Sequence, residues 1–455
     1  MSTDLQSYAH AFVKAEAIPA ISLAVWHDGR LETAAAGVLN LDTGVEATPD
    51  AVFQIGSITK VMTACLVVRL ADAGRIDLDA PVKRYLRDFM IADKEATETI
   101  TVRQLLNHTS GIAGDFFPDD DGLDGNLIAR LVDRGALLPL VHPPGAHFSY
   151  SNVAFTVAGR LAEVVAGVPW AVLMKERIFD PLGMTHAFVD PKEAIRFRAA
   201  VGHVPETEAL DGWRVSDKTY LPLGHAPCGS VATMRAADLI AFARANLADG
   251  GADRSWLSTA SLRAMQAGEV EQPDTGSTVR GRMGLGWMVG EIAESGTRIV
   301  QHNGATHGQM SSLQILPERN AAFAVLMNAA KPTALEKLCN DLLRRLAGVD
   351  RTDPEPDLVN LDTADLEAYA GRYESLDAVV AVERAQDALT ARVAYKHDPI
   401  PPFELRLRPI GSDCFAAYDD QRKRRPNVRF VDRTATGHAA YLFLGGRLTP
   451  RDDRA

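Results

Sequence analysis

Cysteine is scarce in this sequence, and the four cysteines lie far apart. No C-x-x-C motif occurs, and the histidines include no H-E-x-x-H pair. Zinc sites and dithiol redox sites use such closely spaced side chains. We therefore expect neither a metal site nor a cofactor. Cys65 and Cys339 lie in apolar helical patterns, which indicates small buried hydrophobic residues.

Excess positive charge and long apolar runs are missing as well. The formal net charge is −11, whereas a general nucleic-acid binder needs a basic surface for its phosphate contacts. No window approaches the roughly 20 apolar residues that a membrane span needs. The N-terminus carries Asp4 early and lacks the basic region that opens a signal peptide. We expect a soluble, cytoplasmic protein without nucleic-acid or membrane partners.

Strand patterns stand on both sides of a long region of helical patterns. The early run "ISLAVWHDGRLETAAAGV" predicts two strands around a turn at residues 27–29. The late runs "TRIVQH", "MSSLQILP" and "AAFAVLMN" precede an amphipathic helix from about Thr333 to Ala347. Early and late strands must share one sheet. This order predicts an α+β domain with a sheet layer and a helical lobe.

The composition and the hydrophobic pattern of the sequence change after residue 348. "GVDRTDPEPDL" has the proline and acidic content of a linker. Short alternating runs such as "FELRLRP" follow, and they predict a small barrel or sandwich. We therefore expect a first domain over residues 1–348, a linker over 349–357 and an all-β domain over 358–455.

The stretch "FQIGSITKVMTACLVVRL" holds Ser57 and Lys60 at the start of a helix that is apolar on nearly every side. Their spacing places both side chains on one helix face. A serine hydroxyl becomes a useful nucleophile when a neighbouring base takes its proton. A lysine can be that base where burial or nearby positive charge lowers the pKa of its amine. The alternative is a helix-capping Ser57 with Lys60 on the surface.

Two further motifs carry polar side chains suited to the same chemistry. "PPGAHFSYSN" holds Tyr150 and Asn152 before a helix, and "VQHNGATHG" holds His302 and Gly304 on or just after a strand. Tyr150 could be a second proton-transfer group, and Asn152 could hold a substrate carbonyl. As alternatives, Tyr150 is a core tyrosine, Asn152 a helix cap and His302 a surface strand residue.

The glycine at position 304 would let a substrate lie along the strand edge. It would also leave the N–H of Ala305 free to form an oxyanion hole beside the N–H of Ser57. The acidic run "GDFFPDDDGLDG", residues 114–125, is interpreted as a solvated loop, with a lid over the site as the alternative.

With these three motifs in this order, the chain resembles the serine β-lactamase and penicillin-binding protein superfamily, specifically the class C β-lactamase-like serine hydrolases. The resemblance covers about residues 10–347. The tail, with "LEAYAGRYES", resembles the lipocalin-like β-domain appended to some members. The resemblance implies an antiparallel sheet flanked by helices plus an all-helical lobe, with the site between them, followed by a small all-β barrel.

The resemblance also implies a role for each motif residue. These roles are Ser57 as acylated nucleophile, Lys60 as its proton partner, Tyr150 as general base and acid, Asn152 as a contact of substrate or Lys60, and His302 with Gly304 as the strand wall. Where the family usually has a lysine, this chain has His302, which is mostly neutral near pH 7. This difference favours the esterase, amidase and peptidase branch over a β-lactam substrate.

The sequence therefore predicts a serine hydrolase that forms an acyl-enzyme on Ser57 with an ester or an amide or peptide bond, including bonds of D-amino acids. The partner is a small-molecule or peptide substrate. Three alternatives stay open: an acyltransferase or peptide-cyclising thioesterase, a β-lactamase, and a non-catalytic binding protein. The oligomeric state, including a homo-oligomer, stays open too.

Overall fold

The strand Ala321–Met327 (β14) is apolar and buried at every position, because both faces of its sheet are covered. Phe323, Val325 and Met327 pack into one core, and the alternating Ala322, Ala324 and Leu326 pack into another. This period of two is the pattern of a strand between two layers. The computed structural model describes residues 4–118, 126–207, 212–247, 256–277, 279–292, 294–351, 353, 355–396 and 401–452.

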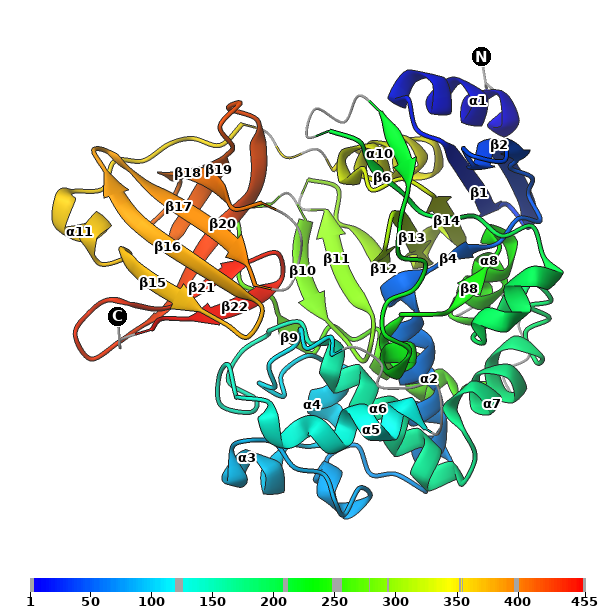
Figure 1. The fold of residues 1–455 in the computed structure, drawn as a ribbon, viewed down its shortest axis with the longest axis horizontal. Helices are drawn as coiled ribbons and strands as arrows, with labels where there is room; N and C mark the ends of the chain where they lie inside the picture. The colour runs from blue at the N-terminus through cyan, green and yellow to red at the C-terminus, as the bar shows by residue number, and fades with distance from the viewer. Residues whose placement is uncertain are drawn as a thin grey trace.

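The strand β14 lies near the middle of a nine-stranded antiparallel sheet (Figure 1). The order is β3-β2-β1-β14-β13-β12-β11-β10-β9. The other strands are β1 (Ala20–His27), β2 (Arg30–Asn40), β3 (Val45–Glu46), β9 (Val270–Glu271), β10 (Val279–Met283), β11 (Met288–Ile292), β12 (Thr297–Thr306) and β13 (Gln309–Leu316). Early and late strands meet where β1 pairs with β14, so the predicted shared sheet is confirmed.

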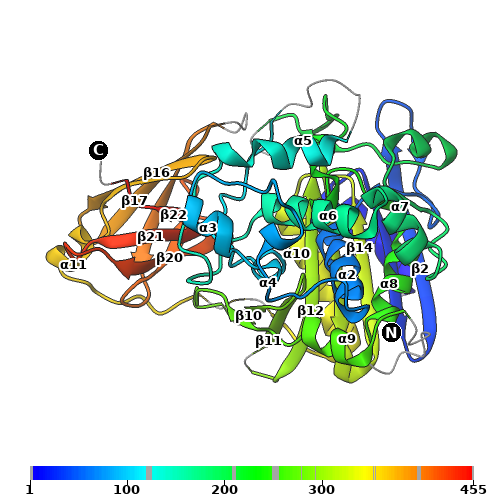
Figure 2. The same cartoon turned by 90° about the horizontal axis from the view of Figure 1, so that it is seen from below.

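Helices cover both faces of this sheet. On one side, α1 (Leu5–Glu16) and α10 (Pro332–Ala347) pack against the core that contains Phe323. On the other side lie α2 (Thr59–Asp72) and α8 (Ala236–Ala245), and Figure 2 shows them in front of the strands. The α+β class and the flanking helices predicted from the sequence are confirmed.

The helical lobe lies below the sheet in Figure 1. Its helices are α3 (Lys94–Thr99), α4 (Val102–Leu106), α5 (Leu127–Asp133), α6 (Asn152–Ala166) and α7 (Trp170–Met174). Within the described residues, no single helix has the length and apolar composition to cross a membrane. One pair, Asn152–Ala166 with Trp170–Phe179, reaches them only jointly, across an 85° bend. The compartment stays a prediction.

After α11 (Thr363–Glu367), eight antiparallel strands follow one another in sequence order. They are β15 (Gly371–Glu374), β16 (Ala378–Ala385), β17 (Ala388–Tyr395), β18 (Phe403–Pro409), β19 (Cys414–Tyr418), β20 (Arg424–Arg433), β21 (Ala439–Leu444) and β22 (Arg447–Pro450). A bridge between Tyr373 and Arg451 joins the first strand to the end of the last. The domain is a nearly closed barrel, and the alternative of a sandwich is wrong.

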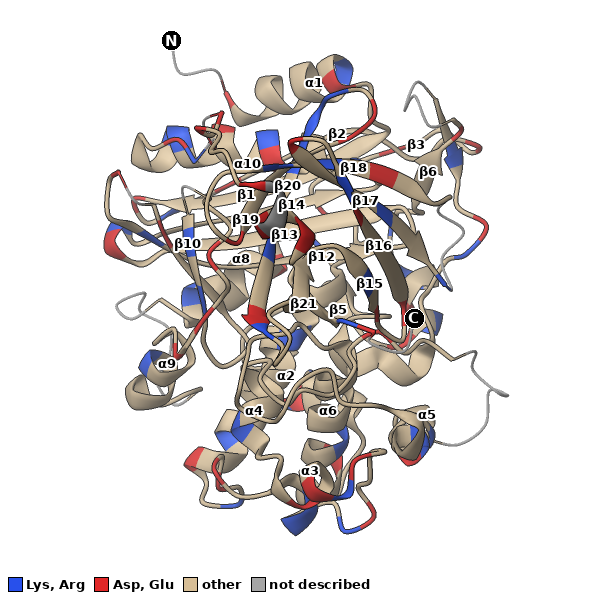
Figure 3. Cartoon of the chain, turned by 90° about the vertical axis from the view of Figure 1, so that its left-hand side faces the viewer, with Lys and Arg blue, Asp and Glu red and all other residues tan. Residues whose placement is uncertain are grey.

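The barrel packs on the helical lobe through its last hairpin. Phe443 and Leu448 of the barrel share an apolar cluster with Phe148 and Tyr150 of the lobe. The backbone N–H of Leu448 donates to the Ser149 hydroxyl at 3.2 Å. Figure 3 shows the barrel side, where basic and acidic residues are interspersed. The barrel hairpin therefore borders the segment that carries the Y-x-N motif.

Candidate active site

The serine of the S-x-x-K motif lies in a 3-10 turn, Gly56–Ile58 (η1), which leads directly into α2. The α-helix therefore begins two residues later than a helix starting at Ser57 would. No side chain caps this helix. Instead, the Lys60 amine donates a hydrogen bond to the Ser57 hydroxyl, with 2.9 Å between Nζ and Oγ. The alternative of a capping serine with a surface lysine is wrong.

Lys60 is completely buried, with a relative exposure of 0%. Its Nζ also donates to the backbone carbonyl of Cys228 at 2.7 Å, and it lies 4.9 Å from the centre of the Tyr150 ring. Two acceptors on a buried amine fix its direction, because the side chain has no water to turn toward. The Cys228 contact could not be predicted from the sequence, since any residue type can supply a backbone carbonyl.

Tyr150 also lies beside the lysine amine and is 8% exposed. Its ring stacks on His108 at 4.3 Å between centroids. The Nδ1 atom of His108 accepts a hydrogen bond from the backbone N–H of Ser151 at 3.0 Å. Burial, together with the charge of Lys60, lowers the pKa of His108 well below its usual value, so the ring is neutral. Among the described residues the Tyr150 hydroxyl has no hydrogen-bond partner, so it is available to a substrate.

Asn152 is the first residue of α6, but it does not cap this helix, because Ser151 does. Its amide nitrogen donates to Asp115 at 2.6 Å. Asp115 in turn forms an ion pair with Arg447 of the barrel. Burial acts to raise the pKa of Asp115, but the charge of Arg447 and the hydrogen bonds from Arg447 and Asn152 outweigh it and lower that pKa.

Asp115 opens the acidic run that the sequence analysis interpreted as a solvated loop. Its side chain is only 9% exposed and is paired, so this interpretation is wrong for Asp115. Phe117, in the same run, has its ring centroid 4.8 Å from that of the His225 ring. The remainder of the run, residues 119–125, lies outside the described residues.

His302 lies on β12 and is buried, with a relative exposure of 1%. Its Nδ1 atom is 2.6 Å from the carbonyl oxygen of Asn303, which a neutral ring satisfies by donating an N–H. Burial, with a further contribution from the charge of Lys60, lowers the pKa of His302 to about 3. The strand motif therefore presents no positive charge to a substrate near pH 7.

The glycines of the two facing segments allow a close backbone contact. A Cβ atom on Gly304 would lie 1.9 Å from the carbonyl oxygen of Ile55. A Cβ atom on Gly56 would lie 2.6 Å from the backbone nitrogen of Ala305. The turn of Ser57 and the strand β12 therefore touch through their backbones. This contact brings the Ser57 and Ala305 N–H groups to the same part of the site.

All seven residues predicted from the sequence thus come together between the sheet and the helical lobe. Three residues that the sequence analysis did not assign to the site join them: His108, Asp115 and Arg447. In the described part of the chain, no group of three or more His, Cys, Asp or Glu side chains is placed to hold a metal ion.

The arrangement defines a class of protein. The chain belongs to the β-lactamase family, whose family model, described as Beta-lactamase, matches residues 5–348. The resemblance stated from the three motifs is therefore confirmed. Penicillin-binding protein 4 of Amycolatopsis lactamdurans is 37% identical over 364 residues, which cover 78% of this chain and 93% of that protein.

Solved structures show the same architecture. The crystal structure of SurE has a TM-score of 0.77 at 28% identity and covers 97% of both chains, so it includes the barrel. The crystal structure of SurE with D-Leu matches at 27% identity and a TM-score of 0.75, again over 97% of both chains. A D-stereospecific amidohydrolase from Streptomyces sp. matches 76% of this chain and 98% of its own, at 26% identity and a TM-score of 0.60. The family and these neighbours support a hydrolase.

The contact between Gly304 and Ile55 leads to a first prediction. Gly304→Ala should push β12 away from the turn of Ser57 and separate the two N–H groups. Loss of one oxyanion-hole donor lowers rates by about 10²–10³-fold. We expect the phosphonylation of Ser57 by a fluorophosphonate probe to slow by that order. In the control Gly281→Ala, the new Cβ would meet only the flexible end of Gln272, and the wild-type rate should persist. An unchanged rate in Gly304→Ala would contradict the prediction that the Ser57 and Ala305 N–H groups form an oxyanion hole.

The low pKa of His302 predicts a pH-dependent stability. The folded state keeps this ring neutral down to about pH 3, whereas an unfolded histidine takes up a proton below about pH 6.5. Stability is therefore lost as the pH falls below that value. Between pH 7 and pH 5 this one group should account for a loss of roughly 2 kcal/mol in the free energy of unfolding. Denaturant titrations should show that His302→Gln removes this part of the loss, and an identical pH dependence in the variant would contradict it.

Proposed function

We propose that the protein is a serine hydrolase that forms an acyl-enzyme on Ser57. One observation carries this proposal: the Lys60 amine is fully buried and lies 2.9 Å from the Ser57 hydroxyl oxygen. A pure scaffold has no use for a buried amine aimed at a serine, because burying an ionisable group costs free energy. A nucleophile beside a base is the arrangement that covalent catalysis requires.

The geometry supports a two-stage reaction. The Ser57 oxygen attacks the carbonyl carbon of the substrate, and its proton passes to the Lys60 and Tyr150 pair. The N–H groups of Ser57 and Ala305 bind the resulting oxyanion. The carbonyl reforms as the bond to the leaving group breaks, and the Tyr150 hydroxyl returns a proton to that group. Water then attacks the acyl-enzyme by the same steps and releases the acid.

The substrate that we propose contains an ester or an amide or peptide bond, with the acyl part derived from a D-amino acid. The D-stereospecific amidohydrolase and the SurE structure with D-Leu support this choice. The neutral His302 supports it as well, because the strand motif lacks the cation that would pair with a substrate carboxylate. A cytoplasmic location and a homo-oligomer remain predictions from the sequence.

A second candidate is acyl transfer, with an amine or alcohol in place of water, as in an acyltransferase or a peptide-cyclising thioesterase. The barrel hairpin beside Tyr150 favours it, because it adds a second wall that could hold an acceptor. The steps up to the acyl-enzyme are the same in both reactions. Product analysis of an activated D-aminoacyl ester, with and without an added amine, separates the two.

Ser57→Ala should abolish covalent labelling by a fluorophosphonate probe, since it removes the proposed nucleophile, the hydroxyl oxygen to which the Lys60 amine donates. Ser7→Ala, on the exposed face of α1, is the control and should label like the wild type. Intact-mass spectrometry detects the adduct. Labelling that persists in Ser57→Ala would contradict the assignment of the nucleophile.

A substrate panel tests the proposed class. Wild type and Ser57→Ala are assayed with p-nitrophenyl acetate, nitrocefin, and D- and L-aminoacyl p-nitroanilides. We expect a burst of p-nitrophenol from the wild type, faster turnover of D than of L substrates, and no turnover by the variant. Turnover of nitrocefin alone would favour the β-lactamase alternative. The absence of any burst would favour the non-catalytic binding protein.

A further inference from the structure

The turn between β21 and β22 brings the barrel into the active site. Gly445 and Gly446 form this turn with φ values of 59° and 82°, a region that glycine adopts without strain. The carbonyl oxygen of Gly446 accepts a hydrogen bond from the backbone N–H of Tyr150 at 3.0 Å. The turn is thereby fixed to the residue proposed to transfer protons, and Arg447 follows it directly.

Arg447 forms a two-pronged ion pair with Asp115. Its Nε and Nη2 atoms donate to the two carboxylate oxygens, and the Nη2 contact measures 3.1 Å. A third donor, Nη1, binds the carbonyl oxygen of Gly445 at 3.1 Å. The guanidinium carbon lies 5.0 Å from the centre of the Tyr150 ring. A paired guanidinium and carboxylate form a rigid unit, because the planar fork matches the two oxygens.

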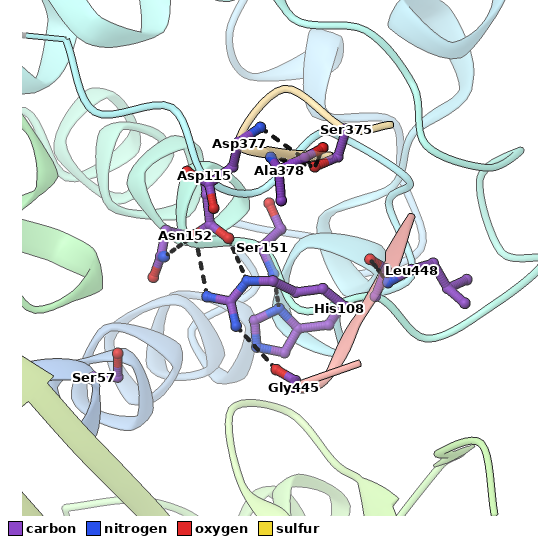
Figure 4. A network of polar contacts seen from close by, with 12 residues as sticks. Ser57, His108, Asp115, Ser151, Asn152, Ser375, Asp377, Ala378, Gly445 and Leu448 are labelled. Carbon is purple, nitrogen blue, oxygen red and sulfur yellow. Dashed lines mark hydrogen bonds and ion pairs between the residues drawn. The ribbon is translucent and has the colours of Figure 1, made fainter. Parts of the chain in front are cut away.

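This unit decides how the amide of Asn152 is oriented. An ionised carboxylate can only accept hydrogen bonds. Asp115, held ionised by Arg447, therefore faces the nitrogen of the Asn152 amide, and the distance is 2.6 Å. The amide oxygen must then point the opposite way. Figure 4 shows this arrangement, with the nitrogen of Asn152 toward Asp115 and the oxygen directed away from it.

We propose that Asp115 and Arg447 are positioning residues that fix Asn152 with its carbonyl oxygen toward the substrate, so that the site selects substrates carrying an N–H donor next to the scissile carbonyl. This inference rests on the proposed function. It reverses the role expected from the sequence, in which Asn152 holds a substrate carbonyl. It also makes the barrel a part of the active site rather than an appendage.

The recognised group is the N–H of an acylated amino acid. An acceptor oxygen held in place gains a hydrogen bond from an N–H but meets only the lone pairs of an ester oxygen at the same position. A buried acceptor left without a partner lowers the rate by about tenfold, which corresponds to about 1.4 kcal/mol. The preference for the N–H substrate should therefore be roughly tenfold or more.

The test compares two p-nitrophenyl esters that differ only in the group next to the α-carbon, which is an N–H in one and an oxygen in the other. One is the ester of N-acetyl-D-leucine, and the other is the ester of the corresponding O-acetyl 2-hydroxy acid, in which oxygen replaces the N–H. The ratio of their kcat/KM values reports the orientation of Asn152. We expect a ratio of roughly ten or more for the wild type, and a ratio near one for Asp115→Asn and Arg447→Met, because the Asn152 amide can then rotate.

Two further variants distinguish loss of the Asn152 orientation from a general disturbance of the barrel–lobe interface. Asp432→Asn removes a barrel–lobe contact to His147, 2.9 Å long, at the same interface but outside the site, and should keep the wild-type ratio. The double variant Asp115→Asn/Asn152→Asp keeps a carboxylate near Arg447 and places an acceptor-only group at position 152. It should restore the preference for the N–H ester even where its absolute rate is lower.

Three outcomes would overturn either the proposed role of Asp115 and Arg447 or the proposed function itself. A wild type that acylates on Ser57 but hydrolyses both esters equally overturns this inference and leaves the proposed function intact. A ratio that stays at the wild-type value in Asp115→Asn and Arg447→Met overturns it as well. A wild type that forms no acyl-enzyme with either ester overturns the proposed function first. Thermal melts of each variant establish that the compared proteins are folded.

Discussion

The hydrogen bond from a buried lysine amine to the Ser57 hydroxyl is the interaction on which the rest of the site depends. A long cationic side chain can occupy a core position only when acceptors are built around it. Here the turn before α2 supplies the serine oxygen, and the distant 3-10 helix Leu223–Cys228 (η6) supplies the Cys228 carbonyl. The turn of Ser57 and this 3-10 helix must both be in place before Lys60 has its two acceptors. The buried position of Lys60 therefore depends on segments that lie far apart in the sequence and supply its acceptors only in the folded protein.

Much of the fold could be predicted because its patterns are local. The turn between β1 and β2 is visible as Asp28-Gly29, and both residues have the positive φ that a two-residue hairpin needs. The helix α10 follows a clear apolar stripe, and the alternation in the C-terminal strands matches the inward-facing positions of the barrel. In each case the residues that determine the element lie within the element itself.

Only some residues of the candidate site could be predicted from local sequence patterns. Ser57, Lys60 and Tyr150 belong to short motifs whose order along the chain is informative. Asp115 and Arg447 belong to no such motif, and they meet across 332 positions of sequence. An acidic run next to glycines has the composition of a solvated loop, and nothing local indicates that a barrel turn will cover its first residue. Pairing between domains cannot be predicted from periodicity, because it depends on how two finished folds dock.

The strand that brings Arg447 to Asp115 also joins the first strand of the barrel through the bridge at Tyr373 and Arg451. Two contacts of the finished fold thus depend on the same late segment of the chain. During translation the sheet, the helical lobe and most of the barrel can emerge and begin to fold while Asp115 still lacks its cation. Barrel closure and the pairing of Asp115 both require β22, so neither can be complete before that strand has been synthesised. The ion pair beside Asn152 therefore forms only after nearly all of the barrel has been made.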